Sequence, residues 1–230
     1  MSIGIIGAMD EEVSILLQDI ELDKVVSKAM MNFNIGKLYK NEVVVVKCGI
    51  GKVNAAVCAQ ILIDDFNVDS VINVGVAGGI GKEVIPGDVV IASSLIQHDM
   101  DVTAFGSKIG QIPRMDCFDF KSDEKLFKSA VDSAKTISNI NIHEGIVVSG
   151  DQFIDSVEKV EWFSDEFNAK ACEMEGASIA QVCYLNSVPF VIIRSISDNA
   201  CTGAHIDFNK FVPIAVKNSS VIIRSLLLNM

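Results

Sequence analysis

The fold class follows from residues 42–76, which read EVVVVKCGIGKVNAAVCAQILIDDFNVDSVINVGV. Glu42–Lys47 and Ser70–Val76 are short β-branched runs, apolar on both faces, as expected of strands in a sheet that is covered on both sides. Between them, Lys52–Phe66 carries apolar residues three and four positions apart, a spacing that predicts a helix. A strand, a helix and a second strand in this order indicate an α/β fold.

The same alternation extends along the chain. Four more apolar runs are predicted strands: Ser2–Ile6, Asp88–Ala92, Gly145–Ser149 and Pro189–Ser195. Three more periodic segments are predicted helices: Asp123–Thr136, Gly176–Asn186 and Asn209–Leu228. We therefore predict a central sheet with helices on both faces and ligand-binding groups on loops at the carboxyl ends of strands. His98–Phe120 breaks the pattern and is predicted to be a long functional or interface loop.

The composition fits one compact domain over residues 1–230. The chain is 50% apolar, 21% charged and 7% aromatic, which excludes disorder. Its mean hydropathy is +0.39, but charges or amides are expected to interrupt each long apolar stretch before the roughly 18 residues that span a bilayer. The net charge is −11 and no basic stripe is present. Nucleic acid and membrane are therefore not expected partners.

The cysteines and histidines predict neither disulfides nor a metal site. The six cysteines form no C-x-x-C pair and several lie in apolar runs, so buried reduced thiols are expected. His98–Asp101 reads HDMD, but no second cluster has ligand spacing. The first twelve residues contain three acids and no basic n-region, which predicts a cytoplasmic protein.

Three glycine loops follow predicted strands, and they are Gly4–Met9, Gly49–Asn54 and Gly75–Lys82. The second loop has Asn54 where a dinucleotide fingerprint needs its third glycine, so a Rossmann NAD site is not expected. The third has Val76 where a Walker A loop has glycine and Glu83 where it has Ser or Thr, which argues against nucleoside triphosphates. Any one loop by itself is explained by an ordinary turn. Three loops together with carboxylates after strands predict one shared small-molecule pocket.

Carboxylates recur beside these predicted strands. Asp10–Glu12 opens a helix, where the dipole favours negative charge, although a simple N-terminal charge preference would give the same pattern. Glu173 and Glu175 lie between apolar residues, where a charge needs a partner. Ile193–Asn199 ends an apolar strand with a cation, two hydroxyls and an acid, the composition expected of a polar site at the carboxyl edge of a sheet.

Taken together, these segments resemble the 5′-methylthioadenosine/S-adenosylhomocysteine nucleosidases, which have the nucleoside phosphorylase/hydrolase-like fold. The matching fragments, in the family's order, are Gly4–Met9 with Glu12, Gly49–Val53, Asn73–Gly79, Asp101–Gly106, Ser149–Ile154, Glu173–Glu175 and Arg194–Asp198. The resemblance runs nearly end to end. It implies an α/β three-layer sandwich with a central mixed, twisted β-sheet flanked by helices.

The resemblance implies hydrolysis of the bond between adenine N9 and ribose C1′ in methylthioadenosine and S-adenosylhomocysteine. The transition state would have oxocarbenium character, and no cofactor is implied. Asp198 would be the general acid that protonates adenine N7, with Ser197 steadying its carboxyl group. Glu12 would activate the attacking water, as a positioned carboxylate can.

The other substrate contacts are implied by the same resemblance. Glu175 would hold the ribose hydroxyls, Met174 would pack against the sugar, and Phe153 would stack on adenine. The backbone at Ile154 would read the base edge, and Arg194 would tune neighbouring acids. The predicted substrate-binding set also contains Glu173, Val76, Ala77 and Gly78.

The resemblance also implies a homodimer. Around the 5′ substituent, the matching positions of this chain are Met9, Ile50 and Phe208. The matching positions that a neighbouring subunit would contribute are Val102, Phe105 and Pro113. Such an apolar lining accepts a methylthio group but leaves a 5′-phosphate without cations, so AMP should be a poor substrate.

Water rather than phosphate is the predicted nucleophile. The resembling phosphorylases bind phosphate with arginines, whereas this chain has three arginines in all and Asn73 in the place of one of theirs. Val76 departs from the Ser or Thr of the nucleosidases and removes a polar contact near the ribose.

Two alternatives stay open at this point. One is a nucleosidase for another adenine nucleoside, such as aminofutalosine or 5′-deoxyadenosine. The other is a catalytically silent nucleoside-binding module. The cellular role is open in the same way, between methionine salvage with amino-acid biosynthesis, relief of methyltransferase inhibition and formation of a quorum-signal precursor.

Overall fold

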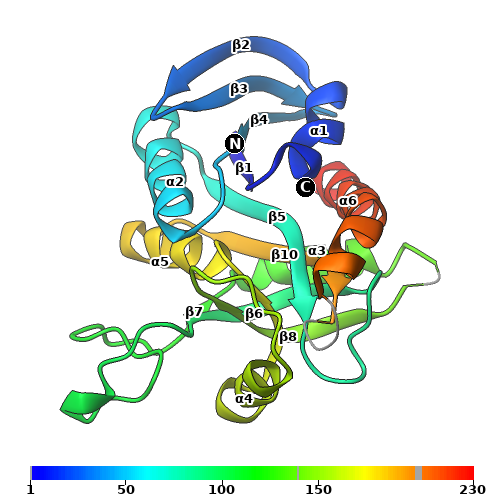
Figure 1. Ribbon diagram of the computed structural model, residues 1–230. Helices are drawn as coiled ribbons and strands as arrows, with labels where there is room; N and C mark the ends of the chain where they lie inside the picture. Colours follow the sequence, from blue (N-terminus) through cyan, green and yellow to red (C-terminus); the bar gives the residue numbers. More distant parts are fainter. Residues whose placement is uncertain (1, 139, 200–203) are drawn as a thin grey trace.

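The structure, a computed structural model, describes residues 2–138, 140–199 and 204–230, without the side chains of 204–209 (Figure 1). The strands are β1 Ser2–Gly7, β2 Glu21–Lys28, β3 Met31–Leu38, β4 Asn41–Lys47, β5 Ser70–Gly79, β6 Val89–Gln97, β7 Phe120–Lys121, β8 Ile142–Ser149, β9 Ala169–Glu173 and β10 Phe190–Asp198. The helices are α1 Asp10–Asp19, α2 Lys52–Phe66, α3 Glu124–Ala134, α4 Val157–Phe167, α5 Gly176–Asn186 and α6 Ala204–Asn229.

The strands form a mixed sheet in the order β10-β6-β8-β9-β5-β1-β4-β3-β2, with β7 paired to β6. β1 lies parallel to β4 and to β5, and β8 lies parallel to β6 and to β9. Antiparallel pairs join β9 to β5 and β10 to β6. Because β5 also pairs in parallel with β10, the strands β5, β10, β6, β8 and β9 form a closed circuit of paired strands.

Helices cover both faces of this sheet (Figure 1). α2 and α5 pack together on one face, where Leu62 and Ile179 belong to one buried apolar cluster. α1, α3 and α6 cover the other face, where Leu16 and Ile222 belong to a second cluster. α4 contacts β8 and β9 and contributes Phe163 to a third cluster. The predicted α/β architecture, a central mixed sheet flanked by helices, is confirmed.

Each of the six predicted strands and four predicted helices corresponds to an observed element. Sequence periodicity missed β2, β3, β7, β9 and α4. β2 lies at the edge of the sheet and most of its residues are exposed, so it lacks the apolar run of a buried strand. β9 is buried but has the short sequence AKACE, without the β-branched residues that mark a strand.

Residues 98–119 form the predicted long loop. They carry the short 3-10 turn Thr103–Phe105 (η1) and otherwise follow an irregular path between β6 and β7. Figure 1 shows this segment, in green, extending away from the sheet. Phe105, in η1, is 90% exposed, so nearly all of this large apolar side chain is in contact with water.

Within α6, Lys210–Asn229 is 20 residues long with a mean hydropathy of 1.5, enough by length and composition to cross a bilayer. Lys217, Asn218 and Arg224 interrupt this stretch, as expected from the sequence. Lys217 and Arg224 are exposed, whereas Ile222 and Leu226 are fully buried. The apolar side of α6 packs on β5 and β10, which accounts for its hydropathy by burial in the core.

Four cysteines in the described part of the chain, among them Cys172 in the third apolar cluster, are buried as the sequence predicted, and Cys117 is partly exposed. Cys48, Cys58 and Cys183 are thiols in the first apolar cluster. Burial raises the pKa of Cys183 to about 12, so it behaves as a small apolar side chain. Cys201 lies outside the described residues.

The loops after β1, β4, β8 and β9 meet the carboxyl end of β10 at one edge of the sheet, because these strands are close in space although distant in sequence. Backbone hydrogen bonds join the loops to one another. The Cys48 N–H donates to the Gly7 carbonyl at 2.9 Å, and the Gly150 N–H donates to the Glu173 carbonyl at 3.1 Å. This edge holds most of the residues that the sequence identified as candidate site residues.

Leu62→Ala is expected to lower the free energy of unfolding by about 2–5 kcal/mol, because Leu62 is fully buried where α2 packs on β1 and truncation leaves a cavity. Asp64→Ala at an exposed position of the same helix should change it by about 0.5 kcal/mol or less. Urea denaturation followed by circular dichroism measures both values. Equal effects of the two substitutions would contradict this packing.

Candidate active site

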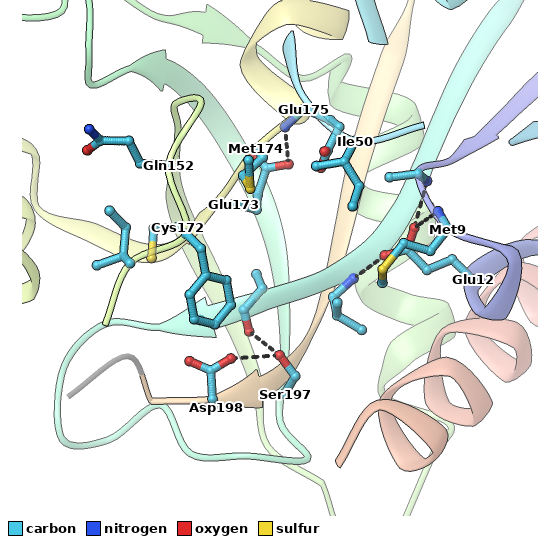
Figure 2. Close-up of a pocket in the computed structure, with 16 residues that line it drawn as sticks. Met9, Glu12, Ile50, Gln152, Cys172, Glu173, Met174, Glu175, Ser197 and Asp198 are labelled. Atoms are coloured by element: carbon cyan, nitrogen blue, oxygen red, sulfur yellow. Dashed lines mark hydrogen bonds between the residues drawn. The ribbon is translucent and has the colours of Figure 1, made fainter. Parts of the chain in front are cut away.

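A cavity of about 120 Å³ opens at the carboxyl edge of the sheet (Figure 2). The predicted residues that line it are Met9, Glu12, Ile50, Val76, Ala77, Gly78, Phe153, Ile154, Glu173, Met174, Glu175, Ser197 and Asp198. Figure 2 shows Ser197 and Asp198 on one side of the cavity and Met9 and Glu12 on the other. Six separate segments of the chain therefore contribute to one concave site.

Glu12 is held by backbone amides from the loop after β1 and from β5. It lies in the first turn of α1, where its Oε2 accepts hydrogen bonds from the N–H groups of Ala8 at 2.6 Å and Met9 at 3.0 Å. Its Oε1 accepts from the Val76 N–H at 2.9 Å and keeps a second acceptor position. Burial raises the pKa of Glu12, although Arg194 and the amide donors oppose the rise.

Gly75 permits this approach of Glu12 to β5. A Cβ atom at position 75 would lie 2.7 Å from Glu12 Oε1 and 3.3 Å from the Arg194 guanidinium. Any side chain there would displace the carboxylate. The lack of a hydroxyl on Val76 leaves this arrangement intact, because Val76 contacts Glu12 through its backbone N–H.

Beneath the cavity, Glu173 and Arg194 form a buried ion pair. Glu173 Oε2 accepts from Arg194 Nη2 at 2.5 Å and Nε at 3.2 Å, and Glu173 Oε1 accepts from the Ser149 hydroxyl. Arg194 Nη2 also donates to Asn73 Oδ1 at 2.6 Å. Burial by itself would raise the pKa of Glu173, but Arg194 and Ser149 hold it below its ordinary value. Arg194 therefore lies beneath the cavity rather than in its lining.

Glu175 is the N-cap residue of α5 and links this helix to the glycine loop before α2. Its Oε1 accepts from the Gly51 N–H at 2.8 Å. Burial and the neighbouring negative charge of Glu173 raise the pKa of Glu175 to about 7. A carboxyl group with a pKa of about 7 can change its protonation state in the physiological pH range.

Asp198 ends β10, next to an irregularity in the pairing of β10 with β5 between Ile196 and Asp198. Asp198 is 2% exposed. The Ser197 hydroxyl donates to Asp198 Oδ2 at 2.9 Å and lies 3.3 Å from the Ala77 carbonyl oxygen. These contacts fix the orientation of an acid at the cavity wall.

The loop after β8 supplies the apolar wall beside Asp198. Phe153 is 52% exposed and Ile154 is buried, and both line the cavity. Met9, Ile50 and Met174 provide further apolar surface in this lining. The cavity thus combines apolar walls with a few fixed carboxylates, as small-molecule sites commonly do.

Some predicted residues lie outside this cavity. Val102, Phe105 and Pro113 belong to the long loop of residues 98–119 and do not line the cavity of their own chain. Phe208 lies in α6, but its side chain is outside the described part of the structure. The roles inferred for these four residues therefore stay predictions.

Sequence reasoning did not single out three of the lining residues: Ala8, Gln152 and Cys172. Ala8 and Gln152 lie inside fragments that carried the resemblance, so their position next to predicted residues was a usable signal. Cys172 lies directly before Glu173, but an apolar run gives no sign that one of its side chains faces a cavity. Among the described residues, no cluster of three or more His, Cys, Asp or Glu side chains is arranged to hold a metal ion.

Comparison with known proteins agrees with this geometry. Residues 2–228 match the family model of the phosphorylase superfamily. A 5′-methylthioadenosine/S-adenosylhomocysteine nucleosidase of Geobacillus sp. (strain WCH70) is 44% identical over 227 residues, covering 98% of this chain and 97% of the relative.

Solved structures give the same relationship. The Neisseria meningitidis 5′-methylthioadenosine/S-adenosylhomocysteine nucleosidase in complex with methylthio-immucillin-A is 40% identical, with a TM-score of 0.96 over 100% of this chain and 99% of that one. A futalosine hydrolase of Helicobacter pylori strain 26695 is 35% identical, with a TM-score of 0.94 over 100% and 98% of the two chains. The chain therefore belongs to the phosphorylase superfamily and, within it, to the 5′-methylthioadenosine/S-adenosylhomocysteine nucleosidases.

Proposed function

We propose that this protein hydrolyses the N-glycosidic bond of 5′-methylthioadenosine and S-adenosylhomocysteine, releasing adenine and a thioribose product. The observation that carries the proposal is the placement of Glu12 and Asp198 on opposite sides of one cavity (Figure 2). Cleavage of this bond needs a proton for the departing base and a base for the attacking water. Its relatives are named for this substrate pair.

Asp198 is the proposed general acid. It donates a proton to adenine N7, so that the base leaves as a neutral molecule. Ser197 holds one carboxyl oxygen by a 2.9 Å hydrogen bond and so orients the acid toward the base. Phe153 beside it stacks on adenine, and the backbone of Ile154 reads the base edge. Both residues belong to the loop after β8 and line the same cavity as Asp198.

Glu12 is the proposed base for water. Three backbone amides fix its carboxylate, and Oε1 keeps an acceptor position for a water proton. The raised pKa makes Glu12 a stronger base than an exposed glutamate. Glu175 and Met174 hold the ribose between the two catalytic carboxyl groups.

Water is favoured over phosphate by the charge of the lining. In the described part of the chain, the cavity is lined by carboxylates, apolar groups and the neutral polar residues Gln152 and Ser197, with neither Lys nor Arg among them. The nearby Arg194 guanidinium is engaged by Glu173 and Asn73. A phosphate dianion would therefore lack the cations that it needs.

We propose a homodimer in which Val102, Phe105 and Pro113 of one subunit close the 5′ end of the partner's cavity, beside Met9 and Ile50. The exposure of Phe105 supports this assignment, because covering a large exposed apolar side chain lowers the free energy. A cytoplasmic location and a role in methionine salvage are part of the same proposal.

A nucleosidase for another adenine nucleoside is the second candidate, supported by the likeness to a futalosine hydrolase. It would use the same carboxylates and differ at the 5′ end. Adenine release from methylthioadenosine, S-adenosylhomocysteine and aminofutalosine, assayed in parallel without phosphate, ranks the two candidates. Release that requires phosphate would overturn the hydrolase assignment.

Asp198→Asn and Glu12→Gln are each expected to lower kcat for adenine release by about 10²–10⁴-fold, because each removes one proton transfer. Glu11→Gln is the matched control, since Glu11 is the exposed neighbour of Glu12 in α1, and it should keep kcat within about twofold. The coupled spectrophotometric assay of free adenine measures all three. Full activity in Asp198→Asn would reject the acid assignment.

The acid limb of the kcat/KM profile is expected to lie above the ordinary glutamate value of 4.5 and to extend toward pH 7. Glu12 and Glu175 both have raised pKa values, with that of Glu175 at about 7, and both act as carboxylates. Activity therefore falls as pH decreases through these values. Glu175→Gln should move the limb to lower pH, because it removes the group that titrates near 7. An activity plateau that continues below pH 4.5 would contradict both assignments.

Phe105→Ala is expected to raise KM for methylthioadenosine about three- to tenfold, because an apolar contact with the 5′ substituent is lost. Light scattering of the unmodified protein should give twice the 24.8 kDa chain mass. Met30→Ala, another exposed apolar position, is the control and should leave KM unchanged. A monomeric mass together with an unchanged KM in Phe105→Ala would exclude the partner contribution.

A further inference from the structure

Three motif residues without a part in the proposed reaction meet beside the cavity. Lys52, the first residue of α2, donates through Nζ to Asp99 Oδ1 at 2.6 Å and through its backbone N–H to Asp151 Oδ1 at 2.8 Å. The Asp151 N–H in turn donates to Asp99 Oδ2 at 3.1 Å. We call Lys52, Asp99 and Asp151 the Lys52 cluster. It joins the loops that follow β4, β6 and β8.

The Lys52 cluster is better shielded from water than the surface ion pairs of the chain. The side chains of Lys52 and Asp99 are 18% and 27% exposed, whereas those of Lys28 and Asp65 are 52% and 37% exposed. Burial by itself would raise the pKa of Asp99, but hydrogen bonds from Lys52 and the Asp151 N–H keep it below its ordinary value. Partly buried, hydrogen-bonded charges hold a geometry more firmly than exposed pairs.

A further contact braces the cluster against α5. Lys52 Nζ also donates to Gln97 Oε1 at 3.0 Å, and Gln97 Nε2 donates to Gln181 Oε1. Gln181 lies in α5, the helix that begins directly after Glu175. Through Gln97 of β6 and Gln181 of α5, the cluster is therefore connected to regular secondary structure as well as to loops.

Lys52 and Asp151 each connect the cluster to a residue that contacts substrate in the proposed site. Gly51, immediately before Lys52, donates its N–H to Glu175 Oε1 at 2.8 Å. Phe153 follows Asp151 by two positions, on a loop that has no regular secondary structure over residues 153–156. The ribose-holding carboxylate and the adenine-stacking ring are thus linked through Lys52, Asp99 and Asp151.

We propose that Lys52, Asp99 and Asp151 are positioning residues that set the separation between Glu175 and Phe153, and thereby the affinity of the cavity for adenine and its nucleosides. The proposal rests on the proposed function for the identity of the ligand. Glu12 and Asp198 lie on α1 and β10, outside the segments that the cluster joins. Loss of the cluster therefore weakens binding and leaves the proton transfers in place.

The test is Lys52→Met, which removes the Nζ hydrogen bonds and retains an unbranched apolar stem. KM for methylthioadenosine and Kd for adenine should both rise about three- to tenfold, the range expected when a binding loop must be ordered on association, while kcat changes by less than about threefold. Lys52→Arg retains the cation and should restore most of the affinity. Lys28→Met breaks an exposed lysine–aspartate pair elsewhere and should leave KM and Kd unchanged.

A merely structural role predicts a different pattern. It would lower Tm and the active fraction while leaving KM and the adenine Kd of the folded protein unchanged, and that result overturns the proposal. If Lys52→Met does not fold, Asp99→Asn weakens the same contact more mildly and is judged by the same two constants. The double variant Lys52→Met with Asp99→Asn should lose less affinity than the sum of the two single losses, because the Lys52–Asp99 hydrogen bond is common to both. Additive losses would overturn the proposal.

Calorimetric titration with adenine needs no turnover, so it separates this proposal from the proposed function. If the unmodified protein binds adenine but hydrolyses no methylthioadenosine, the proposed function fails and the cluster is still judged by the adenine Kd. If hydrolysis proceeds and Lys52→Met leaves the adenine Kd unchanged, the positioning role fails and the proposed function stands.

Discussion

The site depends on the buried ion pair between Arg194 and Glu173. Arg194 is 1% exposed, and its charge lowers the pKa values of Glu12, Glu173 and Glu175 against the effect of burial. Three carboxylates beside one apolar cavity would otherwise repel one another and take up protons. Removal of one member of a buried pair leaves an uncompensated charge, which is far more destabilising than the loss of a surface pair. Arg194 therefore makes this density of acids compatible with a folded core.

Backbone amides do the rest of the positioning. Glu12 is held by N–H groups at Ala8, Met9 and Val76, and Glu175 is held by the Gly51 N–H. Amides on paired strands and tight loops have little freedom, so they fix a carboxylate at small entropic cost. Because Val76 holds Glu12 through its backbone N–H, an apolar side chain at position 76 is compatible with this arrangement. Positioning by backbone amides also explains why glycine at position 75, where a Cβ would touch Glu12 Oε1, matters more than the side chain that follows it.

The buried strands and the covering helices were predictable because their apolar residues repeat with the period of the element. β2 and β9 were not, because β2 is exposed at the edge and β9 is short and lacks β-branched residues. The carboxylates that we propose as catalytic could be identified through resemblance, but their hydrogen-bond partners could not. The sequence leaves open which acid Arg194 pairs with, because its pairing with Glu173 depends on β9 lying between β8 and β5. Phe105, which we propose acts across subunits, does not line the cavity of its own chain, so the folding of one chain does not reveal that role.

The position of the Arg194 guanidinium gives chemically identical glutamate side chains different pKa values. Glu173 bonds directly to Arg194 and has a lowered pKa, so it is a permanent anion that anchors the start of α5 through the Gly176 N–H. Glu12 feels Arg194 only through space and its pKa is raised, which suits a base. Glu175, next to the fixed charge of Glu173, has its pKa raised to about 7. Pairs of like groups whose environments separate their pKa values mark functional sites. Here the separation follows from which glutamate the arginine touches, and so from the order of strands in the sheet.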